Sequence, residues 1–331
     1  MTSTVRGPYF DELHIGQVFD TAPAVTLTEG LAAAHHAIVG NRLRLALDHD
    51  LSRKVSGEGA LVTPALVWDL SIGQSTAATQ KVRANLFYRN LRFQRFPHIG
   101  DTLHTVTTVD ALRANRPQPD RPRTGMAALH IVTTDQSGRT VLDYWRCAML
   151  PVSPGFEGSL AEDDLDAIGT FGSEPAPEST IAGWDLNQFR KNVAGLGFGD
   201  LRVGQTWSID GPDVVTSAPE LARLTGNVAA VHHDAARAGG RRLVYGGHTV
   251  GLALHHVTRA IPTLVTVLSW QSCDHLAPVH EGDALTSTVE VTAMRALDPD
   301  GGIADLRVVT SAQGSGMDIA VLDWRLSVVL P

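Results

Sequence analysis

YFDELHIGQ at residues 9–17 and GFGDLRVGQ at residues 197–205 share a Phe, an acidic residue, a Leu and a closing Gly-Gln in register. Three further pairs of matching segments follow in the same order: residues 39–41 with 225–227, 97–101 with 279–283, and 141–145 with 321–324. The offset between the members of each pair shrinks only slowly along the chain. Self-similarity of this kind is the sequence signature of a repeated structural unit. The sequence therefore predicts one domain that occurs twice.

The repeat divides the 331 residues into two domains and a connection. The first domain is predicted over residues 1–151 and the second over residues 188–331. Residues 152–187 contain the acidic run EDD at 162–164 and the Pro-containing segment EPAPE at 174–178. Such a composition buries little apolar surface, so we expect this segment to be a linker that lies over the surface.

Each copy is predicted to contain one buried helix followed by antiparallel strands. The helix of the first copy begins at Thr63-Pro64 and that of the second near Gly246-Gly247, and both are apolar on most faces. A shorter helix precedes each, behind the capping patterns at residues 26–29 and 216–220. The β-branched segments that follow are residues 103–109, 127–134, 140–150, 285–291, 303–310 and 319–330. The predicted fold class is α+β, with two tandem domains in which an antiparallel sheet wraps around a central helix.

Composition excludes several classes of function. The formal net charge is −8 and no long basic run occurs, which argues against nucleic acid as a partner. Residues 1–10 do not read as a signal peptide, and no apolar run is long enough to span a bilayer, so we expect a cytoplasmic protein without a membrane partner. Cys147 and Cys273 lack the spacing of metal ligands, and we expect them to be reduced and structural.

The segment LTGNVAAVHHD at residues 224–234, followed by LVYGGH at 243–248, is the most informative for function. It resembles the signature of the MaoC-like (R)-specific enoyl-thioester hydratases, which have the hot-dog fold. That family has an acidic residue after a small-Gly pair and a His five positions later. Gly226 and His232 match this pattern, whereas Asn227 stands where the family usually has Asp.

The resemblance implies a reaction that adds water to an α,β-unsaturated acyl-CoA thioester. Asn227 can hold the water by hydrogen bonds but cannot take its proton, so the acid–base work falls mainly on His232. Negative charge that develops on the thioester oxygen needs donors, and backbone N–H groups at a helix N-terminus can supply them. The resemblance assigns this catalytic role to Gly247, within the Gly246-Gly247 turn, where glycine also lets a substrate approach the backbone.

Three neighbouring side chains are further candidates for the substrate site. Tyr245 directly precedes the glycines. His248 directly follows them, and it either lines the site or caps the helix. Asp234 either orients His232 or faces solvent. No metal ligand set and no redox cofactor is implied by the resemblance, because CoA is part of the substrate.

The first copy lacks the acid–base residue. Residues 40–48 align without a gap to residues 226–234, and Ala46 occupies the position of His232. Thr63-Pro64 lies where the glycines are expected. We therefore expect a catalytically degenerate first domain, which in such two-copy proteins helps to form the acyl and CoA pocket. Arg89, Arg92 and Arg95 could contribute to that pocket or could lie on a solvated edge strand.

Within the family, the chain resembles the branch that hydrates mesaconyl-CoA to β-methylmalyl-CoA. The resemblance rests on the Asn227–His232 layout, on GRRLVYGGH at residues 240–248, and on TLTEG at residues 26–30, and that branch also has Asn where other members have Asp. Its substrate has a free carboxylate, which needs a cation near the far end of the acyl chain. Arg241 and Arg242 are the candidates, and we expect only one of them to bind it.

Other functions remain open from the sequence. The chain could be an (R)-specific hydratase of another acyl-CoA or a non-catalytic subunit that binds acyl-CoA. A hot-dog thioesterase is a further alternative, but it would need a carboxylate at the site, and Asn227 disfavours it. The two copies are expected to form one pseudo-dimer, and two chains could then form a homodimer.

Overall fold

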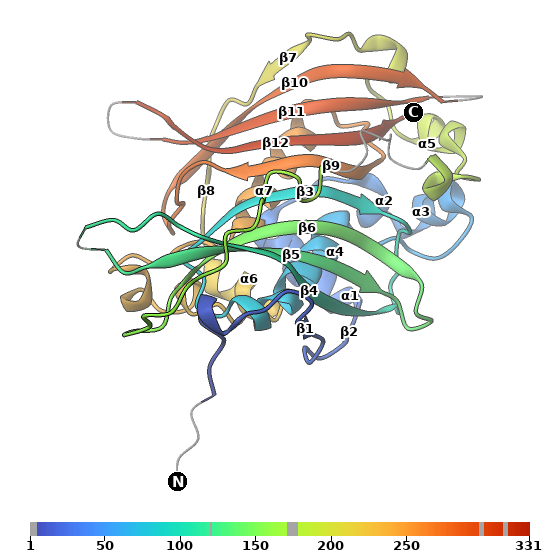
Figure 1. The fold of residues 1–331 in the computed structure, drawn as a ribbon. Helices are drawn as coiled ribbons and strands as arrows, with labels where there is room; N and C mark the ends of the chain where they lie inside the picture. Colours follow the sequence, from blue (N-terminus) through green and yellow to red (C-terminus); the bar gives the residue numbers. More distant parts are fainter. Residues whose placement is uncertain (1–4, 120, 171–177, 298–300, 314–316) are drawn as a thin grey trace.

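A computed structural model describes residues 5–119, 121–170, 178–297, 301–313 and 317–331. Its strands form one sheet in the order β1-β4-β5-β6-β3-β9-β12-β11-β10-β7, with β2 paired to β4 and β8 paired to β10 (Figure 1). The strands of the first copy are β1 (Val18–Phe19), β2 (Val25–Thr26), β3 (Ala84–Phe93), β4 (Thr102–Ala114), β5 (Thr124–Thr134) and β6 (Thr140–Pro151). Those of the second copy are β7 (Thr206–Ser208), β8 (Asp213–Val214), β9 (Thr266–His275), β10 (Ala284–Ala296), β11 (Gly302–Ala312) and β12 (Ile319–Leu330).

The two copies join through β3 and β9, which pair antiparallel in the middle of the sheet. Tyr88 lies opposite Cys273 and Leu91 lies opposite Trp270 in this pair. On either side of the junction the strand order of one copy mirrors that of the other. The prediction of an α+β fold with two tandem domains is confirmed.

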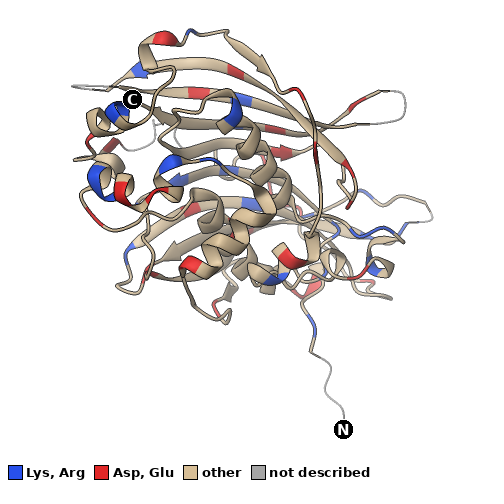
Figure 2. Cartoon of the chain, turned by 180° about the vertical axis from the view of Figure 1, so that it is seen from behind, with Lys and Arg blue, Asp and Glu red and all other residues tan. Residues whose placement is uncertain are grey.

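The helices lie together on one face of the sheet, as Figure 2 shows from behind. They are α1 (Glu29–Val39), α2 (Arg44–Leu47), α3 (His49–Ser56), α4 (Pro64–Gln74), α5 (Leu186–Asn192), α6 (Ala218–Leu224) and α7 (Gly246–Ala260). Every residue of α4 is buried, as its apolar composition predicts. Trp68 of α4 packs edge-on against Trp270 and Trp324 of the second copy, with ring centroids 4.8 and 6.0 Å away. The two copies therefore share one core.

Two local expectations differ from the structure. The edge-strand interpretation of the segment with Arg89 and Arg92 is wrong, because β3 lies between β6 and β9. Ser217 is at the N-cap position of α6, but it adopts a left-handed conformation with φ 58° and forms no capping hydrogen bond. Glu281 accepts the Ala218 N–H instead, at 3.2 Å. The first copy follows expectation, since the Thr28 hydroxyl accepts the Leu31 N–H at 3.1 Å.

The first part of the predicted linker, residues 152–170, runs along the sheet face opposite the helices, whereas its last residues lie against α3, where the Val55 carbonyl accepts the Asp185 N–H at 2.8 Å. The Asp163 carboxylate accepts the Leu112 N–H at 2.8 Å, and Leu165 is buried against Ala128 and Cys147. Most of the Pro-containing part of the segment, residues 174–177, lies outside the described residues. Both cysteines of the chain are free and buried. Within the described ranges, no helix is long and apolar enough to cross a membrane.

Candidate active site

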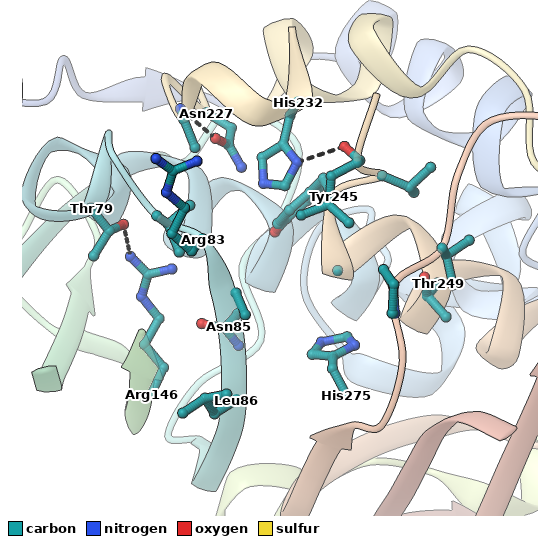
Figure 3. Close-up of a pocket in the computed structure, with 18 of the residues that line it drawn as sticks. Thr79, Arg83, Asn85, Leu86, Arg146, Asn227, His232, Tyr245, Thr249 and His275 are labelled. Carbon is teal, nitrogen blue, oxygen red and sulfur yellow. Dashed lines mark hydrogen bonds between the residues drawn. The ribbon is translucent and has the colours of Figure 1, made fainter. Parts of the chain in front are cut away.

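A cavity of about 350 Å³ lies where the two copies meet (Figure 3). The second copy supplies the loop with Asn227 and His232, the turn before α7, and the end of β9. The first copy supplies the 3-10 helix η2 (Ser75–Thr79), the start of β3, and Arg146 of β6. The site is thus composite, and residues more than a hundred positions apart in the sequence form its walls.

The first copy holds the loop that contains Asn227. The Thr76 hydroxyl accepts the Val228 N–H at 3.0 Å, and the Gln80 carbonyl accepts the Ala230 N–H at 3.2 Å. Gly73 of α4 lies so close to this loop that a Cβ there would lie 1.9 Å from the Thr225 carbonyl oxygen. The first copy therefore has a structural role in the site.

His232 lies at the end of a short 3-10 helix, η5 (Ala230–His232), and the residue is 8% exposed. Its Nδ1 lies 2.9 Å from the Leu243 carbonyl oxygen. A carbonyl oxygen only accepts, so Nδ1 bears the hydrogen and Nε2 has a free lone pair in the neutral ring. Burial lowers the pKa of His232 to about 4, so the ring is neutral near pH 7. The cavity wall therefore has a neutral imidazole with a free lone pair, which can accept a proton.

Asn227 is 3% exposed and lies beside His232 in the cavity wall (Figure 3). Its side-chain oxygen accepts the Ala229 N–H at 2.9 Å. Because a backbone N–H must pair with oxygen, this bond fixes the orientation of the amide and leaves its NH₂ group as the cavity-facing donor. His233 holds the backbone of the same residue, since its Nε2 donates to the Asn227 carbonyl at 2.6 Å.

The Tyr245-Gly246-Gly247 turn begins α7, and Tyr245 and Gly246 line the cavity. The first N–H groups of a helix have no intrahelical acceptor and favour negative charge. Neither position has room for a side chain, so both must be glycine. A Cβ at Gly246 would lie 2.6 Å from Nε2 of His275, and one at Gly247 would lie 2.1 Å from Oδ1 of Asp69.

A buried polar network from the first copy supports Tyr245. The Tyr245 hydroxyl donates to Oδ1 of Asp69 at 3.1 Å, and Nε2 of His35 lies 2.9 Å from Oδ2 of the same carboxyl group. All three side chains are buried. The ring of Tyr245 also meets that of His232 edge-on, with centroids 5.8 Å apart.

The equivalent turn of the first copy has a different chemistry. An isolated β-bridge joins Leu61 to His98 in the first copy, and the equivalent bridge joins Leu243 to His280 in the second. Three residues after the bridged Leu, Pro64 of the first copy therefore corresponds to Gly246 of the second. Pro64 has no N–H group. The first copy therefore lacks a donor at this point of the helix, in addition to having Ala46 where the second copy has His232.

The structure does not bring five of the predicted site residues to the cavity wall. Gly247 lies one residue beyond the part of the turn that lines it. Asp234 is exposed and accepts the Ala236 N–H of its own turn at 2.9 Å. Arg241 pairs with Asp283 at 3.1 Å, and Arg242 pairs with Glu281. His248 is 1% exposed inside α7, and burial lowers its pKa to about 4.

The sequence predicted that the first copy helps to form the pocket, but it did not identify the residues that do so, chiefly Asn85, Arg83 and Arg146. A signal for Arg146 was present, because it is a lone charge inside the apolar strand YWRCAML at residues 144–150. Of the arginines that were expected here, Arg89 donates instead to the carbonyls of Leu165 and Ile168 at 3.3 and 3.0 Å. The described residues contain no cluster of three or more His, Cys, Asp or Glu side chains arranged to hold a metal ion.

Comparison with solved structures gives the family. A conserved protein of Mycobacterium tuberculosis with a double hotdog fold is 53% identical to this chain, with a TM-score of 0.93, and the match covers 98% of this chain and 99% of that one. A protein of Chloroflexus aurantiacus described as a MaoC domain dehydratase is 25% identical, with a TM-score of 0.80, over 100% and 99% of the two chains. The chain belongs to the MaoC-like double hot-dog family.

Two curated relatives of this double hot-dog protein have named activities. The β-methylmalyl-CoA dehydratase of Chloroflexus aurantiacus is 28% identical over 359 residues, covering 99% of this chain and 98% of the relative. The mesaconyl-CoA hydratase of Cereibacter sphaeroides is 28% identical over 330 residues, covering 94% and 91%. No family model matches the chain. These likenesses place the chain among the hydro-lyases, the class of enzyme expected from the sequence.

Proposed function

We propose that this protein reversibly hydrates an α,β-unsaturated acyl-CoA thioester, with mesaconyl-CoA and β-methylmalyl-CoA as the substrate pair. One observation supports the proposal above the others. The hydrogen bond from Nδ1 of His232 to the Leu243 carbonyl leaves the basic nitrogen of a neutral imidazole free at the cavity wall. A hydratase needs such a group to take a proton from water.

In the proposed mechanism, Asn227 and His232 hold one water molecule between them. Nε2 of His232 takes a proton from that water, and the water oxygen bonds to the β-carbon. The electron pair of the double bond moves toward the thioester, and the oxyanion is stabilised by the N–H groups of Gly246 and Gly247. The imidazolium then gives its proton to the α-carbon. The neutral ring is restored, and one molecule of water has been added.

The depressed pKa of His232 fits both directions of this reaction. An imidazole whose pKa is about 4 is fully available as a base near neutral pH. Once protonated it is a stronger acid than an ordinary imidazolium, so it releases the proton readily to carbon or, in dehydration, to the departing hydroxide; the same shift makes the neutral ring a weaker base. The geometry itself favours neither direction.

The test measures loss of the enoyl-thioester absorbance with mesaconyl-CoA and with crotonyl-CoA. We expect hydration of both by the wild-type protein and a loss of about 10²- to 10⁴-fold in kcat for His232→Gln. The matched control is His104→Gln, which alters a histidine of the first copy outside the cavity.

Other outcomes discriminate between the alternatives. Release of free thiol without hydration would indicate a thioesterase. Binding of both thioesters without turnover would indicate an acyl-CoA-binding subunit. Hydration of crotonyl-CoA but not of mesaconyl-CoA would indicate a hydratase of another acyl chain. Full activity of His232→Gln would reject the assigned base.

A further inference from the structure

Three side chains at the cavity have buried polar atoms without a hydrogen-bond partner. They are Nε of Arg146, both amide atoms of Asn85, and Nε2 of His275. Buried polar groups are nearly always paired, because an unpaired one costs about 1–3 kcal/mol. Unpaired buried atoms also occur elsewhere in the described residues, but these three residues line one cavity, where a bound molecule can reach them.

Arg146 is the unusual member of the group because it is a cation that is only 3% exposed. Its guanidinium donates to the Thr79 hydroxyl at 2.5 Å and to the Ser75 carbonyl at 3.3 Å. Both acceptors are neutral, and among the described residues no carboxylate forms an ion pair with it. A buried charge is stable only when it is paired, so Arg146 lacks a negative partner.

The strand geometry brings Asn85 to the same side of the sheet as Arg146. Asn85 pairs with Ala148 and Tyr88 pairs with Arg146, although the two residues of β3 are three positions apart. A register shift between Asn85 and Phe87 accounts for the odd spacing, because an extra residue re-aims the side chains that follow. Figure 3 shows Asn85 between Arg146 and His275 in this view of the cavity.

The only other arginine among the residues that line this cavity differs in exposure. Arg83 is exposed, so it belongs to the mouth, where the polar CoA moiety of a thioester remains in contact with water. Arg146 is buried, so it belongs to the interior, where the acyl chain must lie. Val82, Leu86 and Val244 give the walls around it an apolar character.

We propose that Arg146, with the Asn85 amide beside it, binds the free carboxylate of a dicarboxylic acyl-CoA. This inference rests on the proposed function and identifies the residues that bind the free carboxylate of its acyl chain. The carboxylate receives charge-assisted hydrogen bonds from the Arg146 guanidinium and a further bond from the Asn85 NH₂ group. Specificity is thereby set by the first copy, while the acid–base residue comes from the second. Arg241 and Arg242, already paired with Asp283 and Glu281, are not needed for it.

The experiment compares binding of two saturated thioesters, succinyl-CoA and butyryl-CoA, by calorimetry. The two have the same four-carbon acyl length, and neither has a double bond to hydrate. We expect the wild-type protein to bind succinyl-CoA roughly 10- to 100-fold more tightly, the usual range for a charged hydrogen bond. Arg146→Met should reduce this preference to about one. Arg325→Met, which removes an exposed arginine of β12, is the matched control and should retain it.

Asn85→Asp is a second variant, needed in case Arg146→Met does not fold. Its carboxylate would pair with the Arg146 guanidinium and repel the ligand, so the preference for succinyl-CoA should again be lost. The proposal is overturned if a folded Arg146→Met or Asn85→Asp protein keeps the preference. It is also overturned if Arg242→Met abolishes the preference while Arg146→Met does not.

Failure of this inference and failure of the proposed function give different results. Hydration of crotonyl-CoA by a protein that binds succinyl-CoA no better than butyryl-CoA would refute the carboxylate site and leave the hydratase. Absence of hydration with both crotonyl-CoA and mesaconyl-CoA would refute the hydratase, whereas the calorimetric preference would still report on Arg146.

Discussion

The hydroxyl group of Tyr245, at the start of the second copy's central helix, donates to the carboxyl group of Asp69 in the central helix of the first copy, at 3.1 Å. His35 lies 2.9 Å from the other oxygen of that carboxyl group. Burial raises the pKa of Asp69, whereas its hydrogen bonds with His35 and Tyr245 act in the opposite direction. The turn of the proposed oxyanion site is therefore anchored by the copy that has Ala46 in place of His232.

Tyr245→Phe should lower both stability and turnover. Removal of the hydroxyl leaves Oδ1 of Asp69 buried without its partner, which should cost about 1–3 kcal/mol of unfolding free energy. Because the hydroxyl anchors the turn that has the proposed oxyanion donors, kcat should fall as well. Urea unfolding and the hydration rate would measure the two effects. Tyr144→Phe, which removes a buried hydroxyl 3.0 Å from Ser71, should lower stability alone. Equal kcat in Tyr245→Phe and wild type would contradict the anchoring role.

Gly73→Ala should displace the loop that contains Asn227. A Cβ at Gly73 would lie 1.9 Å from the Thr225 carbonyl oxygen, so α4 and the loop must separate. We expect a loss of about 1–3 kcal/mol in stability, as for other overpacked sites, together with a loss of activity. The control is Gly199→Ala, since a Cβ at Gly199 would have no neighbour within 4 Å. Unchanged hydration by Gly73→Ala would show that the first copy does not position the loop.

Stability should decline as the pH falls from about 6.5 toward 4. Burial lowers the pKa of His232, His248 and His275 to about 4 each, against about 6.5 in an unfolded chain. Between these values the unfolded state binds more protons than the folded state. The stabilisation is therefore complete above 6.5 and is lost as the pH falls through 4.

Urea midpoints recorded between about pH 7 and pH 4.5 would measure this decline. His275→Gln should flatten it, because one of the buried groups that take up protons on unfolding is then absent. His14→Gln, at an exposed position, should leave the slope as it is. A midpoint that stays constant over this range would contradict the depressed pKa values.

Local patterns in the sequence predicted much of the fold. The apolar composition of α4 and α7 and the partial alternation of β4, β5, β10 and β11 depend on near neighbours, so the sequence reports them directly. The β3–β9 junction was not predictable in the same way. In β3 the residues ANLFYRNLRF do not alternate, because the register of the strand shifts twice against β6.

In the site, too, residues close together in the sequence were predictable, whereas residues brought together by the fold were not. Asn227, His232 and Gly246 occur within 20 residues of one another, and a motif identified them together. Asn85 and Arg146 come from the other copy and reach the cavity only through strand pairing. Arg241 and Arg242 looked like free cations in the sequence. Their partners, Asp283 and Glu281, lie in a distant loop and are visible only in three dimensions.

Asn227→Asp should raise the pKa of the acid–base residue. A carboxylate in place of the amide would keep the acceptor that pairs with the Ala229 N–H, so the loop should retain its conformation. It would also place a negative charge beside the buried ring of His232 and stabilise the imidazolium. The acidic limb of the pH–rate profile with crotonyl-CoA should then move up from about 4, the pKa of His232 in the present site.

Asn227→Asp also tests whether the amide at position 227 is an adaptation to an acyl chain with a carboxylate. An added carboxylate would repel an acyl chain that has its own carboxylate, so mesaconyl-CoA turnover should fall relative to that of crotonyl-CoA. Asn227→Ala is the control, since it removes the donor without adding charge and should leave the acidic limb near its original pH. If the limb stays in place in Asn227→Asp, His232 does not govern the profile. If the substrate ratio also stays the same, the amide at 227 is not an adaptation to an anionic acyl chain.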